Sequence, residues 1–277
     1  MKNRSPLVSI IMPAYNAANY IKESILSVQA QTYPHWELIV VNDGSIDQTE
    51  AILQTFTDSR IHYFFQENKG VSAARNFGLR QMKGKFFCFL DSDDIFTPQS
   101  IEIRIRKFLA EPQTGMIDGG VLFKDDRLEK TKRIYKPKYR GRVLKEIAFF
   151  NEGVFALPSA MIRREDGVPY SFNESLTHSE DLLFMLQVHA RSTLAFSYVS
   201  DPILIYRKSN TSAMSNLQGL GKGYLNYYSE VNKMPNLLNV LDKKLLKIKI
   251  AKVMFLSYCA KGHYKQALKY IYEVFKK

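Results

Sequence analysis

The first 110 residues alternate between apolar runs of strand length and segments whose apolar side chains recur at helical spacing. The predicted strands are 8–12, 37–41, 61–65 and 86–90, and the predicted helices are 20–32, 45–56, 71–82 and 97–109. Ser45-Ile-Asp-Gln48 fits a capping box, and Thr97 before Pro98 fits an N-cap followed by a first helical turn. Alternation at such short intervals predicts an α/β fold with helices covering a mostly parallel sheet.

The alternation becomes less regular after residue 112. Further strands are predicted at 116–123 and 154–162, with a charged connection over 124–142 between them. Thr177-His-Ser-Glu180 fits a second capping box, which predicts a helix from there to about Ala190.

Residues 216–277 are predicted to form helices only. Apolar residues follow one face at Leu241, Leu245, Ile248, Phe255 and Cys259, and another at Tyr264, Leu268, Ile271 and Phe275, with Gly262 between. Gly219-Leu-Gly-Lys-Gly223 resembles a phosphate-binding loop, but its spacing is wrong and no strand precedes it. This glycine-rich segment is therefore predicted to be a turn.

Polar residues follow directly after each predicted strand, at 13–16, 42–45, 66–75 and 91–94. In open parallel sheets, ligands bind beyond the carboxyl ends of the strands. We therefore expect a binding site formed by these four loops.

The composition is that of a globular chain, with 45% hydrophobic and 24% charged residues among 277. Lys and Arg exceed Asp and Glu by 39 to 27, and this excess favours an anionic partner. Two cysteines, Cys88 and Cys259, are too few for a disulfide framework. No apolar run approaches the roughly 18 residues of a membrane span. A cytoplasmic protein is expected, with peripheral contact to the inner face of the plasma membrane left open.

Asp91-Ser-Asp-Asp94 is the most informative local feature of the chain. Clustered carboxylates repel each other unless they are solvated or neutralised, and a divalent cation bound through oxygen neutralises them. A solvated turn that caps the next helix is the alternative. The four residues by themselves do not separate the two interpretations.

Five segments, in order along the chain, resemble family 2 glycosyltransferases. They are Leu7–Asn16, Gln31–Tyr33, Glu37–Ser45, Asn68–Gly78 and Phe89–Asp94. The resemblance is nearly continuous from residue 7 to about residue 98, and weaker parts extend to about residue 215. It implies the A-type glycosyltransferase fold, with a Rossmann-like sheet and a helical C-terminal extension. The implied divisions are a nucleotide-sugar half at 1–98, an acceptor half at 99–215 and a basic helical extension at 216–277.

The resemblance also implies which residues bind the donor nucleotide. Tyr15 would stack on the base, Asp43 would hydrogen-bond the edge of the base, and Arg75 would reach the base or the diphosphate. The remaining implied contacts are Pro13, Asn16, Gly44, Ser45, Asp91, Ser92 and Arg207. A packing aromatic at Tyr15 and a turn residue at Asp43 are the structural alternatives. Gly70 and Gly78 are expected to serve backbone geometry and packing.

By the same resemblance, Asp91 and Asp93 form an Asp-x-Asp motif that holds Mn²⁺ or Mg²⁺, with Asp93 in direct contact. Such a metal would neutralise the departing diphosphate. The chain departs from the family pattern at Ser209, where many relatives carry histidine. The third metal ligand is therefore open, and Arg207 or Lys208 would supply compensating positive charge.

Glu180-Asp181 resembles the acidic pair of the family's acceptor half. Asp181 would act as general base on the acceptor hydroxyl, and a single displacement would then invert the anomeric carbon. The alternative is structural, because acidic residues suit the first turn of a helix.

The predicted reaction is the transfer of one sugar per encounter from a nucleotide donor, with UDP as the expected nucleotide. The Gln-x-x-Arg-Trp motif of processive relatives is absent, and Trp36 is the single tryptophan. The acceptor is expected to be a surface glycan carried by a lipid or a cell-wall polymer. A sugar nucleotidyltransferase and a non-catalytic nucleotide-sugar-binding protein are the alternatives; nucleic acid is not an expected partner.

The C-terminal residues 237–277 contain ten lysines against Asp242 and Glu273, which contributes +8 of the net charge of +12. Two interpretations stand for this basic segment. It docks on an anionic membrane surface, or its helices pack on the catalytic domain or against a second subunit.

Overall fold

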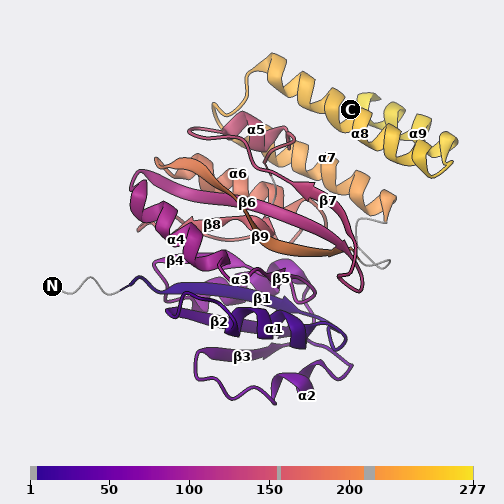
Figure 1. The fold of residues 1–277 in the computed structure, drawn as a ribbon. Coiled ribbons are helices and arrows are strands. Elements are labelled where there is room, and N and C mark those ends of the chain that lie inside the picture. Colours follow the sequence, from indigo (N-terminus) through magenta and orange to yellow (C-terminus); the bar gives the residue numbers. More distant parts are fainter. Residues whose placement is uncertain (1–4, 155–156, 209–215, 277) are drawn as a thin grey trace.

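The computed structural model describes residues 5–154, 157–208 and 216–276. The strands are β1 (Val8–Ala14), β2 (Trp36–Asp43), β3 (Ile61–Gln66), β4 (Phe86–Phe89), β5 (Ile95–Phe96), β6 (Thr114–Asp125), β7 (Thr131–Tyr135), β8 (Met161–Arg163) and β9 (Ala195–Lys208). In the described residues they form one sheet in the order β3-β2-β1-β4-β8-β6-β9-β5, and β7 pairs with β6 (Figure 1). The β3-β2-β1-β4 half is parallel, whereas β8 is antiparallel to both of its neighbours.

Helices cover this sheet and form the C-terminal region (Figure 1). They are α1 (Ile21–Gln29), α2 (Thr49–Leu53), α3 (Val71–Gln81), α4 (Ser100–Ala110), α5 (Leu144–Ala148), the 3₁₀ turn η1 (Leu157–Ser159), α6 (Glu180–Arg191), α7 (Leu217–Lys233), α8 (Val240–Ala260) and α9 (Tyr264–Lys276). None of the helices within the described ranges is long and apolar enough to cross a membrane. The predicted α/β class with a helical C-terminal region is confirmed.

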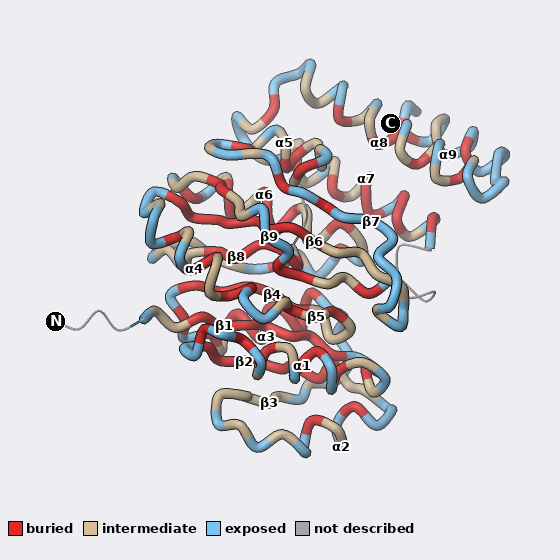
Figure 2. The backbone as a smooth tube through the Cα atoms, in the orientation of Figure 1, coloured by how far each residue is buried: buried red, intermediate tan, exposed pale blue. Residues whose placement is uncertain are grey.

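Successive residues of the central strands enter different cores, because side chains alternate between the two faces of a sheet. Ile10 and Met12 of β1 lie in the core under α1 and α4, whereas Ile11 lies in the core under α3 and α6. β1, β2 and β4 are buried along their whole length (Figure 2). Burial on both faces explains why these strands are continuous apolar runs in the sequence.

The C-terminal helices share a core with the second half of the sheet. Tyr227 of α7, Met254 of α8 and Val274 of α9 lie in the same buried cluster as Phe184 of α6. The glycine-rich segment predicted as a turn lies inside α7, so that prediction is wrong. Its middle residue, Gly221, allows close helix packing, because an added Cβ there would come within 2.7 Å of a ring carbon of Tyr270 on α9.

Both predicted capping boxes are wrong. α2 begins at Thr49 rather than after Ser45, and the Ser45 amide instead donates to the Asn42 side chain at 3.0 Å. α6 begins at Glu180 after Ser179, whose backbone is left-handed with φ of 62° and makes no side-chain cap. The polar side chains of these two sequences bond to other parts of the fold, as described below for Glu180.

The second half of the sheet differs most from the sequence-based expectation. The charged connection 124–142 includes β7, which forms a hairpin with β6. The strand expected at 154–162 is β8, which begins only at Met161 after a 3₁₀ turn; residues 155–156 of that expectation lie outside the described ranges. The sequence pattern predicts neither β5 nor β9. It also misses β7, because four of the five β7 residues are exposed and the strand therefore has no apolar run.

The apolar face predicted for α8 is not the one that packs. Leu241, Leu245 and Ile248 are exposed, whereas Leu246 and Ile250 are buried. α8 carries apolar residues on two sides, and the core uses only one of them.

Gly78→Ala tests the packing of α3 on the sheet. An added Cβ would overlap the side chain of Ile11, which is fully buried in β1. Overpacking at such a site costs about 1–3 kcal/mol, more than the helix propensity gained from alanine. We expect a lower urea midpoint. Arg80→Ala, on the exposed side of the same helix, should leave the midpoint within about 0.5 kcal/mol of the parent. A Gly78→Ala protein as stable as the parent would contradict this packing.

Candidate active site

The loops that follow β1, β2 and β4 meet at the carboxyl ends of the parallel strands. Tyr15 follows β1 and is 52% exposed, so its ring is accessible to a ligand. The backbone N–H of Asn16 donates to Ser45 Oγ at 2.9 Å, and Asn16 Oδ1 accepts from the Ile46 N–H at 2.9 Å. These two bonds join the loops after β1 and β2, so the predicted residues Tyr15, Asn16 and Ser45 lie close together, whereas Pro13 is buried within β1.

Asp43, at the end of β2, is buried and organises the loop before α3. Its Oδ1 accepts from Gln66 Nε2 at 2.7 Å and from the Lys69 N–H at 2.9 Å, and its Oδ2 accepts from the Gly70 N–H at 2.8 Å. Gly70 has φ of 88°, a conformation that favours glycine. The observed contacts of Asp43 are therefore structural, and a bond to a base edge would use its remaining acceptor capacity.

Gly44 allows the loop after β2 to approach the loop before α3. Its φ is 72°, and an added Cβ would lie 2.7 Å from the backbone nitrogen of Asn68. This crowding, together with the left-handed backbone, makes glycine necessary here.

Arg75 connects the aspartate motif to the acidic pair of α6. It projects from α3 and is 5% exposed; Nη2 pairs with Asp91 Oδ1 at 2.9 Å, and Nη1 with Glu180 Oε1 at 3.1 Å. Its Nε is buried without a hydrogen-bond partner among the described residues. One guanidinium thus holds together carboxylates that are 89 positions apart in the sequence (180 − 91).

Asp181 lies half-buried beside this bridge. Burial and the neighbouring Glu180 carboxylate raise the pKa of Asp181 to about 6, against the opposing influence of Arg75. Asp181 Oδ1 accepts from the Leu182 N–H at 2.8 Å. A carboxylate with a pKa in this range accepts a proton readily at neutral pH, as a general base must.

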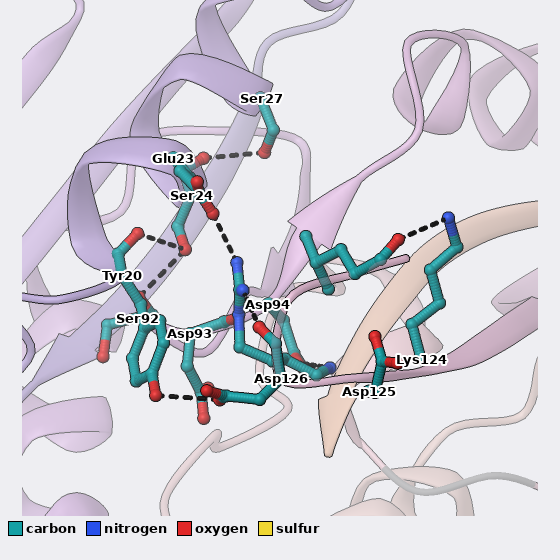
Figure 3. Close-up of polar contacts among 12 residues, drawn as sticks. Tyr20, Glu23, Ser24, Ser27, Ser92, Asp93, Asp94, Lys124, Asp125 and Asp126 are labelled. Atoms are coloured by element: carbon teal, nitrogen blue, oxygen red, sulfur yellow. Dashed lines mark hydrogen bonds and ion pairs between the residues drawn. The ribbon is translucent and has the colours of Figure 1, made fainter. Parts of the chain in front are cut away.

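Asp93 lies on the other side of the aspartate motif, among further carboxylates (Figure 3). Burial and the nearby Asp91 raise the pKa of Asp93 to about 6, and Asp126 adds to the increase. Asp126 comes from the turn between β6 and β7 and accepts from the Tyr20 hydroxyl at 2.8 Å. The sequence alone does not indicate Tyr20 or Asp126, because Asp126 lies in the segment 124–142 that is predicted to be a charged connection, and Tyr20 approaches it only through the fold.

Arg207 holds the aspartate loop from β9. Its Nε donates to the Asp93 carbonyl at 2.9 Å, and its backbone N–H donates to Asp94 Oδ1 at 2.9 Å. The guanidinium also bonds to Glu23 and to the Asp126 carbonyl, over the ring of Tyr20. Arg207 is 5% exposed and all three of its side-chain nitrogens are engaged. Its observed role is to position the loop, and contact with a nucleotide sugar stays a prediction.

The Ser92 backbone is held by α1, since Ser24 Oγ donates to the Ser92 carbonyl at 2.9 Å (Figure 3). Ser209, the position of the departure from the family pattern, lies outside the described residues.

The residues around Asp93 fit a divalent cation. Oxygen ligands suit Mn²⁺ and Mg²⁺, and the pKa of Asp93 is raised by burial first and by the neighbouring Asp91 carboxylate second, against the opposing charge of Arg207. Within the described part of the chain, no three His, Cys, Asp or Glu side chains are grouped as a complete metal site.

Comparisons with known proteins agree with this geometry. The profile described as Glycosyl transferase family 2 matches residues 9–166. TuaG of Bacillus subtilis, whose name assigns it provisionally to teichuronic acid biosynthesis, is 32% identical over 84% of this chain and 92% of its own length. WfgD of Escherichia coli, named as a UDP-Glc:α-D-GlcNAc-diphosphoundecaprenol β-1,3-glucosyltransferase, is 48% identical over 37% of this chain and 41% of its own.

Other relatives match over a shorter part of their length. An uncharacterised glycosyltransferase of Rickettsia typhi is 52% identical over 101 residues, which are 36% of this chain and 31% of the relative. The chain thus matches about a third of the length of that protein.

Solved structures share the fold. Staphylococcus aureus TarS in complex with UDP-GlcNAc aligns with a TM-score of 0.66 over 96% of this chain and 81% of that one, at 20% identity. A Pyrobaculum calidifontis mannosyltransferase in complex with GDP-Man and Mn²⁺ aligns with a TM-score of 0.63 over 93% of this chain and 76% of that one, at 17% identity. These likenesses confirm the predicted A-type fold.

Arg75→Lys tests the bridge between the two acidic clusters. Lysine keeps the charge but cannot pair with two carboxylates through a planar fork, so buried negative charge is left poorly compensated. We expect the free energy of unfolding to fall by about 1–3 kcal/mol, measured by urea denaturation. Arg80→Lys on the same helix is the matched control and should be neutral. If both variants unfold at the parent midpoint, Arg75 does not hold the clusters together.

Proposed function

The chain belongs to glycosyl transferase family 2, and from that membership we propose that it moves one sugar from a nucleotide donor to a hydroxyl of a glycan acceptor. The observation that carries the proposal is the Arg75 bridge, which joins the aspartate motif Asp91–Asp93 to the acidic pair Glu180–Asp181. A displacement at a sugar carbon needs charge control at the leaving diphosphate and a base for the acceptor. The bridge keeps groups suited to both tasks side by side.

The proposed donor is a UDP-sugar. The exposed ring of Tyr15 would stack on the base, and the joined loops after β1 and β2 would hold the ribose side of the nucleotide. The name of WfgD specifies UDP-Glc, and TarS has been solved with UDP-GlcNAc. Both relatives support a uridine nucleotide here.

Asp91 and Asp93 would hold Mn²⁺ or Mg²⁺, which when bound supplies positive charge at the departing diphosphate. Asp181 would take the acceptor proton as the acceptor oxygen attacks the anomeric carbon from the face opposite the diphosphate. Asp181 Oδ1 is engaged with the Leu182 N–H, so Oδ2 is the oxygen assigned to the proton. A single attack of this kind inverts the anomeric configuration.

Arg75 would act through its neighbours in this mechanism. Paired with Asp91 and Glu180, it keeps positive charge near Asp181 and so favours the ionised base. Glu180, held by Arg75, would orient the acceptor or the base.

The enzyme would release its product after one transfer rather than extend a chain.

The proposed acceptor is a surface glycan, in particular one carried on a lipid diphosphate. The names of TuaG and WfgD place those relatives in teichuronic acid synthesis and in transfer to a diphosphoundecaprenol-linked sugar. The proposed location is the cytoplasmic side of a membrane, where the two unpaired thiols, Cys88 and Cys259, would remain reduced.

The proposed function is tested with a panel of UDP-, GDP- and TDP-sugars, each with and without Mn²⁺. We expect nucleotide release and transfer to a lipid-diphosphate sugar with one of the UDP-sugars, with inversion of configuration in the product. Binding without turnover for every donor and acceptor would favour the non-catalytic alternative. Release of pyrophosphate from a sugar phosphate and UTP would identify a nucleotidyltransferase.

Asp181→Asn isolates the base. Asparagine matches aspartate in size but accepts no proton, so we expect transfer to fall by about 10²–10⁴ while UDP affinity stays within about twofold. Because the pKa of Asp181 is higher in the folded protein than in the unfolded chain, its ionisation destabilises the folded parent, and this cost is complete above about pH 6. Asparagine carries no charge, so the variant should unfold at a higher temperature than the parent at pH 7.5. That difference should shrink toward pH 4. Parent-like transfer by the folded variant would remove Asp181 from the mechanism.

The pH profile separates the base from the metal ligands. Because ionised Asp181 is required, kcat/KM should fall about tenfold per pH unit below about 6. Asp93 also titrates near 6 in the metal-free protein, but bound metal lowers its pKa. Profiles at two saturating Mn²⁺ concentrations should therefore have the same acid limb. If the pKa of the acid limb shifts with metal concentration, the limb reports the ionisation of Asp93 instead of Asp181.

A further inference from the structure

α8 and α9 expose apolar side chains on the sides that the core leaves unused. These residues, here called the outer apolar surface, are Val240, Leu241, Leu245, Ile248, Leu256, Tyr264, Leu268, Tyr272 and Phe275, and they are 45–72% exposed. The buried residues of the same helices, such as Met254 and Val274, pack toward α7 and the main core. Both helices are therefore apolar on one side for packing and apolar on another side that faces solvent.

The outer apolar surface follows helical spacing on each helix. Leu241, Leu245 and Ile248 recur at intervals of four and three residues, so they form a stripe along α8. Tyr264, Leu268 and Tyr272 recur at intervals of four along α9. A three-residue turn joins the helices, which lie against each other in the structure (Figure 1). The stripes consequently lie on neighbouring antiparallel helices.

The charge around these stripes is strongly positive. Residues 237–277 carry ten lysines and only two acidic residues. Asp242 is already paired with Lys145 of α5 at 2.7 Å, and Glu273 lies 3.9 Å from Lys269. An apolar surface surrounded by lysines is complementary to a surface that is apolar beneath and anionic above.

We propose that α8 and α9 dock the protein on an anionic phospholipid membrane through the outer apolar surface. Leucine and phenylalanine side chains enter the boundary of the acyl region, and the lysines extend along it to reach the phosphates. Tyrosine, with an apolar ring and a polar tip, suits the interface between the two. The depth of such docking is that of a helix lying in the interface, without any crossing of the bilayer.

A second copy of this chain fits the same surface less well. Lys252 lies in the α8 stripe, four residues after Ile248, and is exposed. Lys244 on α8 and Lys265 on α9 are exposed as well. Pairing two such surfaces would bring lysines against lysines in an apolar interface, where unpaired charge is costly. An anionic leaflet neutralises the same charges.

Vesicle binding by the 277-residue chain tests the proposal without donor or acceptor, and so independently of the proposed reaction. The probes are phosphatidylcholine vesicles with and without phosphatidylglycerol. We expect flotation with the anionic vesicles, weakened by salt. Leu241→Gln with Leu268→Gln should reduce the bound fraction at least tenfold. The matched control is Leu109→Gln with Ile134→Gln, which removes equally exposed apolar side chains from α4 and β7 and should bind like the parent.

A charge series completes the test. Lys244→Glu with Lys252→Glu should weaken binding by at least about fivefold per lysine, whereas Lys130→Glu with Lys132→Glu on the β6–β7 hairpin should not. Equal binding by all variants, or no preference for anionic vesicles, overturns the proposal. So does a protein that binds no vesicles but sediments as a dimer that Leu241→Gln with Leu268→Gln dissociates, because that result assigns the surface to a second copy.

Discussion

The geometry of the candidate site depends on a single buried cation. Arg75 lies under the carboxyl ends of the parallel strands, and Asp91, Glu180 and Asp181 are all close enough to interact with it. Without this guanidinium, the acidic start of α6 and the loop after β4 would repel each other across a poorly solvated gap. The position of the start of α6 relative to α3 and to the loop after β4 is therefore stabilised by ion pairs as well as by packing.

The parallel half of the fold is predictable because its chemistry is local. β1, β2 and β4 are covered on both faces, so each is an uninterrupted apolar run between polar loops. The rule that ligands gather at the carboxyl ends of such strands then identifies the loops that the structure brings together. The loops that contain Tyr15, Asn16 and Ser45 are identified in this way and are joined by hydrogen bonds, whereas the binding of a nucleotide by these residues stays a prediction from the family resemblance.

The rest of the site is harder to predict from the sequence, because its side chains bond to residues that are far away along the chain. Glu180 has the identity and position expected of a capping residue, yet its carboxylate pairs with Arg75 of α3. Asp126 lies in a charged segment, and its closeness to Asp93 depends on a hairpin with an exposed strand. Arg207 holds the aspartate loop through bonds to the Asp93 carbonyl and to Glu23, a positioning role that the sequence does not indicate, and its contact with a nucleotide sugar stays a prediction. No local sequence pattern shows whether such a side chain caps a helix, lies in solvent or bonds to a distant part of the fold.

The contacts of Arg207 also set an order of events during synthesis. The aspartate loop that it holds is complete once residue 94 has been made, but the residue that fixes it is 113 positions later. β9, which carries Arg207, inserts between β6 and β5 in the sheet. On the ribosome, the amino-terminal strands therefore emerge with their apolar surfaces ready to pair, while the loop at their end still lacks its clamp. A nascent chain therefore gains neither its complete core nor an ordered aspartate loop until β9 has been made, because Ile203 and Leu204 of that strand lie in the same buried cluster as Ile10 of β1.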